Sequence, residues 1–427
     1  MTEAGRARAG RAESEDGQVG VVLAGAGARG AYEAGVLAEL LEYLDDRGER
    51  PRVFIGTSAG AINAVLFASL AHLPADAASK QALSLWRSVH KSMVLNPLIL
   101  TPFAIGRFVI ERHLGIKISN PRLAGLSGGL LDTRPLRKTL EERLNWNDLH
   151  NNVRSGTVKA VAVTATVCRR GGYTEIFVET PAPRTLQSDE DRAIRYRNVA
   201  LKPAHVLASS AIPVVFPPVH LEAAERMDKA GCWYIDGGTR LNAPILPAIK
   251  LDVTKVVVIA ADPARRFTKE AGAGAERPPA IEDTFVQLLN GAMTDRMIED
   301  LSTLNKINEF IGTATGDGGT VKSRTGREYK IIKSVFGGPE PGHVDELGQL
   351  AGSVLTTSLT GARGLRSLDL RLARSMLGRP SRSQGELLSY LLFEPEFLHE
   401  AIHLGQRDAR RIIDRAGKNG DIWNLPG

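Results

Sequence analysis

Short apolar runs alternate with amphipathic stretches at the start of the chain. Val19 to Ala24 is apolar, and Ala31 to Leu44 carries leucine and valine at helical spacing with glutamates opposite. A second apolar run, Val53 to Ile55, is followed by a helix-forming stretch from Ala59 to about Leu73, which Pro74 closes. This strand–helix–strand–helix order is typical of a parallel sheet that helices cover on both faces.

Three later segments have the composition of further strands in the same sheet. They are Thr157 to Thr166, Glu175 to Glu179 and Lys255 to Ala260. Helical or irregular stretches separate them, and no internal repeat is present. We therefore expect an α/β fold of three layers, α/β/α, around a mainly parallel central sheet.

The composition changes after about Arg265. Four stretches follow: a linker or loop rich in alanine, glycine and glutamate (Glu270 to Pro279), amphipathic helix (Ile281 to Ile311), a short strand (Tyr329 to Lys333), and mostly helix (Arg366 to Arg415). These helices carry leucine, isoleucine and phenylalanine at core spacing.

We accordingly expect three parts. Residues 1–18 are rich in arginine, alanine, glycine and glutamate without an apolar core, which predicts a disordered tail and not a signal peptide. Residues 19–265 form the α/β domain. Residues 266–427 form a mostly helical C-terminal extension packed on it, and a regulatory or membrane-facing cap is the alternative.

Composition and charge narrow the class of protein. Hydrophobic residues make up 43% and charged residues 24% of the 427 residues, as in ordinary globular proteins. The net charge of +6 comes from dispersed basic residues without interleaved aromatics, which argues against nucleic-acid binding. A net positive charge of this size fits weak attraction to anionic lipid headgroups better. The longest candidate for a membrane span, Met93 to Ile110, is broken by two prolines and an arginine.

The two cysteines, Cys168 and Cys232, have the spacing of neither a disulfide framework nor a metal site. Both have apolar neighbours in the sequence, so we expect buried, reduced thiols. Reduced thiols suit a cytoplasmic protein, which could also associate peripherally with a membrane.

A serine stands where the second strand meets its helix. The sequence Gly56-Thr57-Ser58-Ala59-Gly60 has the form of a nucleophile elbow, a sharp strand-to-helix turn that exposes a serine hydroxyl. Gly56 and Gly60 would let the main chain bend closely there. The following helix would place its partial positive charge near an oxyanion. An ordinary helix start with small residues is the alternative interpretation.

A glycine-rich loop follows the first strand. It contains Gly25, Ala26, Gly27, Ala28, Arg29 and Gly30. Read as a dinucleotide-binding loop, it requires an acidic residue at the end of the second strand. Asp45 and Asp46 fall at the end of the first helix instead, and no Gly-Lys-Ser/Thr follows that would make a P-loop.

The same loop fits an oxyanion hole. Glycine turns expose main-chain amides that stabilise a negative charge developing on a carbonyl oxygen. Loops after neighbouring parallel strands open on the same edge of a sheet, so this loop and Ser58 can converge. Arg29 could orient the loop, meet an anionic group of the substrate, or form a simple salt bridge.

A serine nucleophile needs a base. None of the nine histidines lies in a glycine-flanked loop at a strand end, and His205 and His220 have the sequence context of ordinary surface or core residues. A stronger candidate is Asp236, which an apolar strand delivers into a turn formed by Gly237 and Gly238. Apolar surroundings raise the basicity of such a carboxylate. An Asp-Gly-Gly sequence is also a common turn.

Taken together, these features resemble the patatin-like phospholipases, a family of lipid acyl hydrolases. The resemblance covers about residues 18 to 250 and is carried by four blocks: Gly25–Gly30, Gly56–Gly60, Ala208–Pro218, and Asp236–Gly238 with Asn242 and Pro244 after it. It implies the patatin-like α/β fold and a Ser–Asp dyad without histidine.

The resemblance assigns a role to each matching position. Ser58 would be the nucleophile that forms an acyl-enzyme, and Asp236 the base. The amides around Gly25, Gly27 and Ala28 would form the oxyanion hole. One position departs from the family: many members have glycine where Ala26 stands. Alanine keeps the amide, and the hole survives unless that position requires a positive φ.

The expected function is hydrolysis of fatty-acyl esters in phospholipids or acylglycerols, with no cofactor and no metal. The partner would be a lipid substrate, presented at a membrane surface, and not a nucleic acid. Met93 to Ile110 is a candidate lid or membrane-contact segment, and a buried core segment is the alternative. The competing functions are a nucleotide-binding oxidoreductase built on the glycine loop and a non-catalytic scaffold of the same fold.

Overall fold

The computed structural model describes most of the chain. The described residues are 18–95, 131–213, 215–222, 231–263, 284, 287, 291–315, 320–322, 328–360, 382–419 and 421–424. Several predicted segments lie outside them: nearly all of the N-terminal tail, residues 96–110, the Glu270–Pro279 linker, and residues 366–381 of the last helical stretch.

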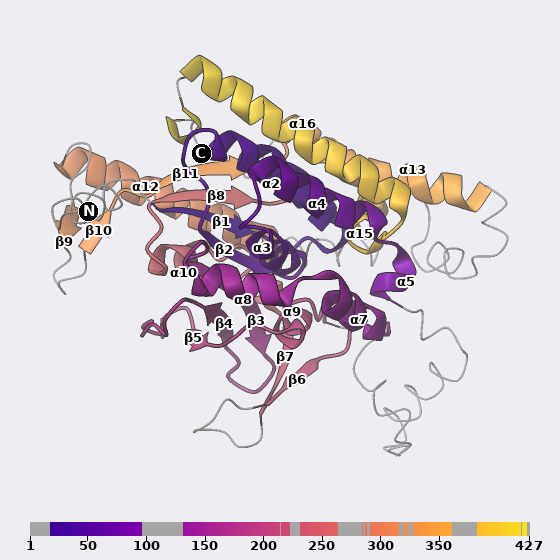
Figure 1. Ribbon diagram of the computed structural model, residues 1–427. Helices are drawn as coiled ribbons and strands as arrows, with labels where there is room; N and C mark the ends of the chain where they lie inside the picture. The colour runs from indigo at the N-terminus through magenta and orange to yellow at the C-terminus, as the bar shows by residue number, and fades with distance from the viewer. Residues whose placement is uncertain are drawn as a thin grey trace.

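A mainly parallel sheet forms the centre of the molecule (Figure 1). Its order is β11-β8-β1-β2-β3-β4-β5, and the β6–β7 hairpin pairs with β3. Neighbours from β11 to β3 are parallel, whereas β4 and β7 both run antiparallel to β3. The strands are β1 (Val19–Leu23), β2 (Val53–Thr57), β3 (Ala160–Val167), β4 (Thr174–Glu179), β5 (Ile194–Asn198), β6 (Val219–Leu221), β7 (Cys232–Asp236), β8 (Lys255–Ile259) and β11 (Lys333–Gly337).

Helices cover both faces of this sheet. One face packs on α2 (Gly30–Asp45), α3 (Ala59–Ser69) and α16 (Pro395–Asn419), and the other on α10 (Ile245–Lys250) and α12 (Arg296–Thr315). Side chains on both faces of β1, β2 and β3 are buried, which explains why these strands read as continuous apolar runs. The prediction of a three-layer α/β fold is confirmed.

The remaining elements surround these layers. They are α4 (Ala75–Ser88), α5 (Lys91–Val94), α7 (Arg134–Arg143), α8 (Trp146–Arg154), α9 (Pro203–Ser209), α13 (Glu346–Thr360), α15 (Arg382–Leu391), the short turns η1 (Gly27–Arg29), η3 (Gly237–Thr239), η4 (Gly291–Asp295), η5 (Pro341–His343) and η6 (Ile422–Asn424), and the small hairpin of β9 (Thr320–Lys322) and β10 (Glu328–Lys330).

Three local predictions differ from the structure. The strand expected from Tyr329 to Lys333 is divided, because β10 joins a separate hairpin and β11 begins at Lys333. The helix after Ser58 ends at Ser69, earlier than Leu73. The expectation of two buried thiols is wrong: Cys168 is exposed in the turn after β3, and Cys232 at the start of β7 is half-buried.

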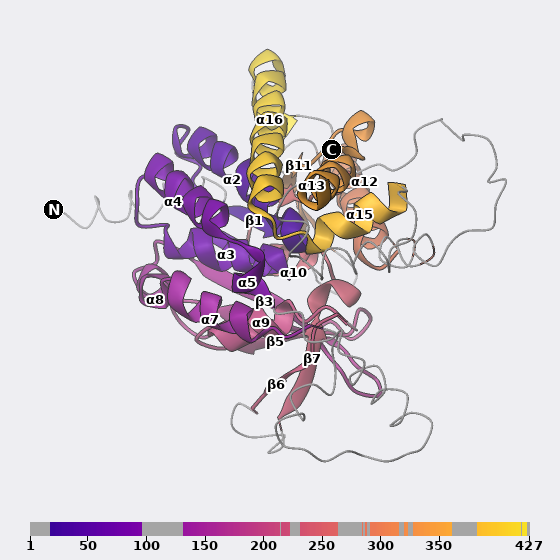
Figure 2. The same cartoon turned by 90° about the vertical axis from the view of Figure 1, so that its right-hand side faces the viewer.

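The C-terminal region completes the sheet as well as covering it. Strand β11 adds to β8 at one edge, and α16 runs along α2 in both views (Figures 1 and 2). Two glycines allow this close helix packing. A Cβ at Gly405 would lie 2.1 Å from the carbonyl oxygen of Tyr32, and a Cβ at Gly35 would lie 2.3 Å from that of Ile402.

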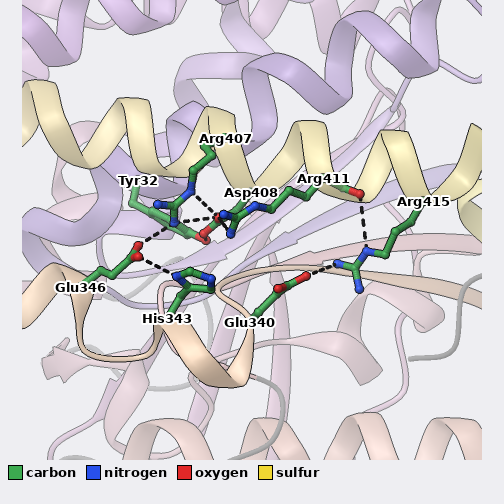
Figure 3. A network of polar contacts seen from close by, with 8 residues as sticks. All are labelled: Tyr32, Glu340, His343, Glu346, Arg407, Asp408, Arg411 and Arg415. Atoms are coloured by element: carbon green, nitrogen blue, oxygen red, sulfur yellow. Dashed lines mark hydrogen bonds and ion pairs between the residues drawn. The ribbon is translucent and has the colours of Figure 1, made fainter.

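A polar network fastens the same contact (Figure 3). The Tyr32 hydroxyl donates to Asp408 at 2.8 Å, and this carboxylate is 3% exposed. Arg407 pairs with both Asp408 and Glu346, and Glu346 also meets His343. These bonds join α2, α16 and the start of α13, so a helix near the start of the chain is held by one near its end.

The α2–α16 contact predicts opposite effects for two alanine substitutions in one helix. Gly405→Ala should lower the free energy of unfolding by about 2 kcal/mol, because the added methyl meets main-chain atoms that cannot move aside. Gly417→Ala, with no atom within 4 Å of the new Cβ, should be neutral or stabilising by up to about 1 kcal/mol. Urea denaturation of both variants measures the difference. Equal stabilities would contradict the close packing.

Candidate active site

Ser58 occupies a strained turn between β2 and α3. Its φ of 55° and ψ of −124° lie where side chains other than glycine are costly, and its side chain is 2% exposed. A Cβ at Gly56 would lie 2.1 Å from the Gly60 carbonyl oxygen, and one at Gly60 would lie 2.4 Å from that of Ala24. The turn therefore has the form of a nucleophile elbow, and both glycines are sterically required.

The main chain of the elbow is fixed by a residue to which the sequence assigned no role. Ser209, at the end of α9, accepts the Ser58 amide at 2.8 Å and donates its own hydroxyl to the carbonyl of Thr164 at 2.6 Å. Ser209 thus ties the elbow to β3. Its only sequence signal was membership of the Ala208–Pro218 block, in which Val214 lies outside the described residues.

Asp236 ends strand β7 in a buried position. Its carboxylate is 1% exposed, and one oxygen accepts the Gly238 amide at 2.7 Å. A Cβ at Gly237 would lie 2.4 Å from the Thr164 carbonyl oxygen, so this turn presses directly on β3. Burial raises the pKa of Asp236 to about 6, while the Ser58 hydroxyl and the Gly238 amide oppose part of that rise.

Strand register brings Ser58 and Asp236 together. Thr57 pairs with Thr164 on β3, and Asp236 pairs with the next residue, Ala165, on the same edge of β3, because β4 occupies the other edge. The Ser58 hydroxyl is near enough to lower the pKa of the carboxyl. Within the described residues, the second oxygen of Asp236 has no hydrogen bond of good geometry. That oxygen is free to accept a proton, and such bonds often tighten only with substrate bound.

No histidine among the described residues lines the cavity next to Ser58. His205 instead accepts the Lys202 amide at the start of α9 and stacks on Phe177. Burial lowers its pKa to about 4, so it is neutral near pH 7. The expectation that His205 is an ordinary core histidine agrees with these contacts.

The glycine loop lies beside the elbow, but one of its predicted donors is already used. The Gly25 amide donates to the side-chain oxygen of Asn242 at 2.9 Å, so this predicted oxyanion donor is engaged within the protein. Gly27 has a φ of 57° and lines the cavity with Ser58. No described residue accepts a hydrogen bond from the Gly27 or Ala28 amide. Ala26 has a φ of −142°, which alanine adopts without strain.

Arg29 does not line the cavity. Its guanidinium is 4% exposed, pairs with Asp262 at 3.0 Å, and lies 4.0 Å from the ring centre of Tyr390. Of the three roles considered for Arg29, the structure favours the salt bridge together with loop orientation. Gly30, the last residue of the loop, begins α2, and a Cβ there would lie 2.8 Å from that of Ala59.

The dinucleotide interpretation of the loop fails on position. The acidic residue that reads a ribose belongs at the end of the second strand, where β2 runs into Ser58. Asp45 instead ends α2 and pairs with Arg50.

An almost entirely apolar cavity of about 60 Å³ opens next to Ser58. Its walls come from α3, α4, α5, α7, α9 and α15 and their neighbours: Gly27, Ser58, Ala59, Ile62, Leu85, Trp86, Val89, Val94, Leu136, Thr139, Leu140, Arg143, Leu144, Ser210, Ile212, Phe216, Tyr390 and Phe393. The site therefore joins a buried serine and a buried carboxylate to a space suited to an apolar group.

Comparison with known protein families gives a match over residues 21–249, more than half of the chain, to the family described as patatin-like phospholipase. The chain belongs to the patatin-like phospholipase family. The match spans Ser58, Asp236 and the glycine loop, and the family is one of lipid acyl hydrolases. The resemblance predicted from the four sequence blocks is confirmed.

Other comparisons add little to this family assignment. Among solved structures, VipD from Legionella pneumophila is similar at 13% identity, with 95% of this chain and 78% of that chain covered. The TM-score is 0.27, too low to bear on fold or activity. No curated protein matches the chain.

The described ranges of this patatin-like chain contain neither a candidate membrane span nor a candidate metal cluster. No helix in those ranges is both long enough and apolar enough to cross a membrane. They also contain no cluster of three or more histidine, cysteine, aspartate or glutamate side chains arranged to hold a metal ion.

The strained turn predicts a difference between two replacements of Ser58. Both Ser58→Ala and Ser58→Gly remove the hydroxyl, but only glycine relieves the positive φ. Ser58→Gly should therefore be more stable than Ser58→Ala by about 1 kcal/mol, since strain of this kind costs about 1–3 kcal/mol and glycine loses part of the gain to chain entropy. Chemical denaturation of the two variants measures this. A more stable alanine variant would argue against the strained geometry.

Proposed function

We propose that the protein is a serine lipid acyl hydrolase that cleaves fatty-acyl esters of phospholipids or acylglycerols with a Ser58–Asp236 dyad. The observation that carries the proposal is the strained Ser58 beside a buried carboxylate at the wall of an apolar cavity. Membership of the patatin-like phospholipase family supports it.

In the acylation step, Ser58 Oγ attacks the ester carbonyl carbon while Asp236 takes the hydroxyl proton. The tetrahedral adduct then collapses, the bond to the alcohol oxygen breaks, and Asp236 returns the proton to the leaving alcohol. In deacylation the same carboxylate takes a proton from water, which attacks the acyl-enzyme. The fatty acid leaves and Ser58 regains its proton. No histidine is required, because one carboxylate serves as base and acid in turn.

The environment of Asp236 suits this role. A general base is most effective when its pKa lies near the working pH. Burial raises the pKa of Asp236 to about 6, so the carboxylate is mostly ionised at pH 7 yet more basic than an exposed aspartate. The oxygen without a hydrogen-bond donor is the one left to receive the proton.

The Gly27 and Ala28 amides are our proposed oxyanion hole. Both belong to the short turn η1, which leads into the 16-residue helix α2, so the positive end of that helix faces the same place. Gly27 shares the cavity with Ser58. Gly25 takes no part, since Asn242 holds its amide.

The apolar cavity is the proposed site of the first carbons of the fatty-acyl chain, next to the ester. Side chains such as Ile62, Trp86 and Phe216 would contact methylene groups, and burial of each CH₂ contributes about 0.8 kcal/mol. Substrates of this kind reside in membranes. We therefore propose contact with a membrane surface from the cytoplasmic side, which the charge of +6 would favour.

A fluorophosphonate probe tests the nucleophile. The wild-type protein should become labelled, and Ser58→Ala should not, because the phosphonyl group needs the Oγ atom. Ser210→Ala is the matched control, since Ser210 lines the same cavity and should leave labelling intact. Asp236→Asn should remain folded but lose ester hydrolysis. Labelling that persists in Ser58→Ala would refute the assignment and favour a non-catalytic scaffold.

The pKa of Asp236 predicts the pH profile. Only the ionised carboxylate accepts a proton, so kcat/KM for a soluble short-chain ester should fall about tenfold per pH unit below pH 6 and level off above it. Rates measured between pH 4.5 and 8 on protein shown to be folded throughout test this. A profile that levels off only above pH 7 would indicate a different base.

A further inference from the structure

The side chain of Arg29 joins the glycine loop to a part of the chain more than 350 residues away. Its Nε donates to the Ser389 hydroxyl at 2.6 Å, and one Nη donates to the Glu386 carbonyl at 3.1 Å. Both acceptors belong to α15. The other Nη pairs with Asp262, which lies just beyond β8. Each arm of the guanidinium is therefore bound outside the loop.

Asp262 is the centre of this cluster. One carboxylate oxygen accepts Arg29 at 3.0 Å, and the other accepts the hydroxyls of Tyr390 at 3.2 Å and Thr294 at 3.1 Å. The aspartate thus links the end of β8, the glycine loop, α15 and η4. Its side chain is 13% exposed and that of Arg29 is 4% exposed, so water screens the pair weakly.

Tyr390 also touches the loop directly. A Cβ at Gly27 would lie 2.3 Å from the Tyr390 carbonyl oxygen, so the main chain of α15 rests on the residue that supplies a proposed oxyanion donor. The Tyr390 ring stacks on Arg29 at 4.0 Å, and Tyr390 lines the cavity together with Phe393. Helix α15 is therefore a wall of the site as well as a support for it.

The loop needs such support. A three-residue turn with a glycine at φ 57° has little stiffness of its own. Within it, the Arg29 amide donates to Ala26 at 3.1 Å, and Asn242 holds only the Gly25 end. Oxyanion donors stabilise a transition state only when they are fixed to within about 0.5 Å. The Gly30 amide at the start of α2 donates to the Gly27 and Ala28 carbonyls, and further restraint on this turn comes from the Arg29 side chain and α15.

We propose that Asp262 and Tyr390 are positioning residues for the oxyanion hole. They hold Arg29, and through it the Gly27 and Ala28 amides, in the geometry that binds the developing oxyanion. The C-terminal region is then part of the catalytic apparatus. This inference rests on the proposed hydrolase function and goes beyond it, because it assigns roles to residues that touch no reacting atom.

The test uses variants that remove one interaction each from the full-length protein. Tyr390→Phe deletes the hydroxyl that donates to Asp262 and keeps the ring and the carbonyl. Asp262→Asn keeps the shape and removes the charge. Tyr32→Phe is the matched control. Tyr32 on α2 donates to the buried Asp408 on α16, which pairs with Arg407, so a similar Tyr–Asp–Arg arrangement loses one hydroxyl at the α2–α16 contact (Figure 3).

We expect kcat for a soluble ester, per titrated active site, to fall about 10-fold in Tyr390→Phe and up to about 100-fold in Asp262→Asn, with KM within about twofold. Inhibition by an acyl trifluoromethyl ketone, whose serine adduct carries an oxyanion, should weaken by the same factors. Binding of a fatty alcohol of the same chain length should not change. Tyr32→Phe should lose stability but keep kcat within about twofold.

Three results would overturn the inference. Unchanged kcat and ketone inhibition in Tyr390→Phe would show that the cluster is only structural. A change confined to KM and alcohol binding would make Tyr390 only part of the acyl-chain wall. A loss of kcat in Tyr32→Phe as large as in Tyr390→Phe would show a general effect of destabilisation. Should Asp262→Asn fail to fold, Tyr390→Phe still decides. A wild-type protein without hydrolysis or labelling would refute the proposed function instead.

Discussion

Main-chain atoms of β1, β2 and α3 meet at the elbow with no room for a side chain, and the whole site follows from that contact. Gly56 lies against the Gly60 carbonyl, and Gly60 lies against the end of β1. The close approach holds Ser58 at a positive φ and places the loop after β1 beside it. Ser209 ties the Ser58 amide to β3, and β3 pairs with β7. The elbow is therefore fixed relative to the strand that carries Asp236.

The electrostatic environment of Asp236 is the second constraint on the proposed dyad. Asp236 is buried with one oxygen unbonded among the described residues, an arrangement that lowers stability above pH 6 because the ionised carboxylate loses hydration without full compensation. The pKa of the Asp236 carboxyl is higher in the folded protein than in the unfolded chain, so ionising it disfavours folding. The penalty disappears as the pH falls through 6 toward 4, where the carboxyl is protonated in both states. Ser58 and Asp236 both cost stability, the serine through its positive φ and the aspartate through its buried charge. Such costs are expected at a functional site.

The sequence allowed the fold class, the elbow and the Asp236 turn to be predicted because each depends on a local pattern: apolar runs, helical spacing and glycines at turns. Contacts across the fold escaped prediction. Nothing in the sequence near Gly25 indicates that its amide donates to Asn242, 217 residues later, although Asn242 follows one of the four sequence blocks of the family. The exposure of Cys168 depends on where β3 ends, which apolar neighbours do not reveal. Strand β11 joins the sheet only because β8 offers a free edge.

The loop beside Ser58 is held at both ends, and two amides in its middle have no acceptor among the described residues. Asn242 holds Gly25 at one end, and Arg29 is bound to Asp262 and α15 at the other. Between them lie Gly27 and Ala28, whose amides have no acceptor among the described residues. Donors that are held in place but unbonded stabilise an oxyanion without reorganising. This arrangement therefore suits the proposed oxyanion hole better than a loop whose amides are all bonded within the protein. One anchor lies within the family match and the other reaches the last third of the chain, so the proposed oxyanion hole depends on residues outside the family match as well as on residues within it.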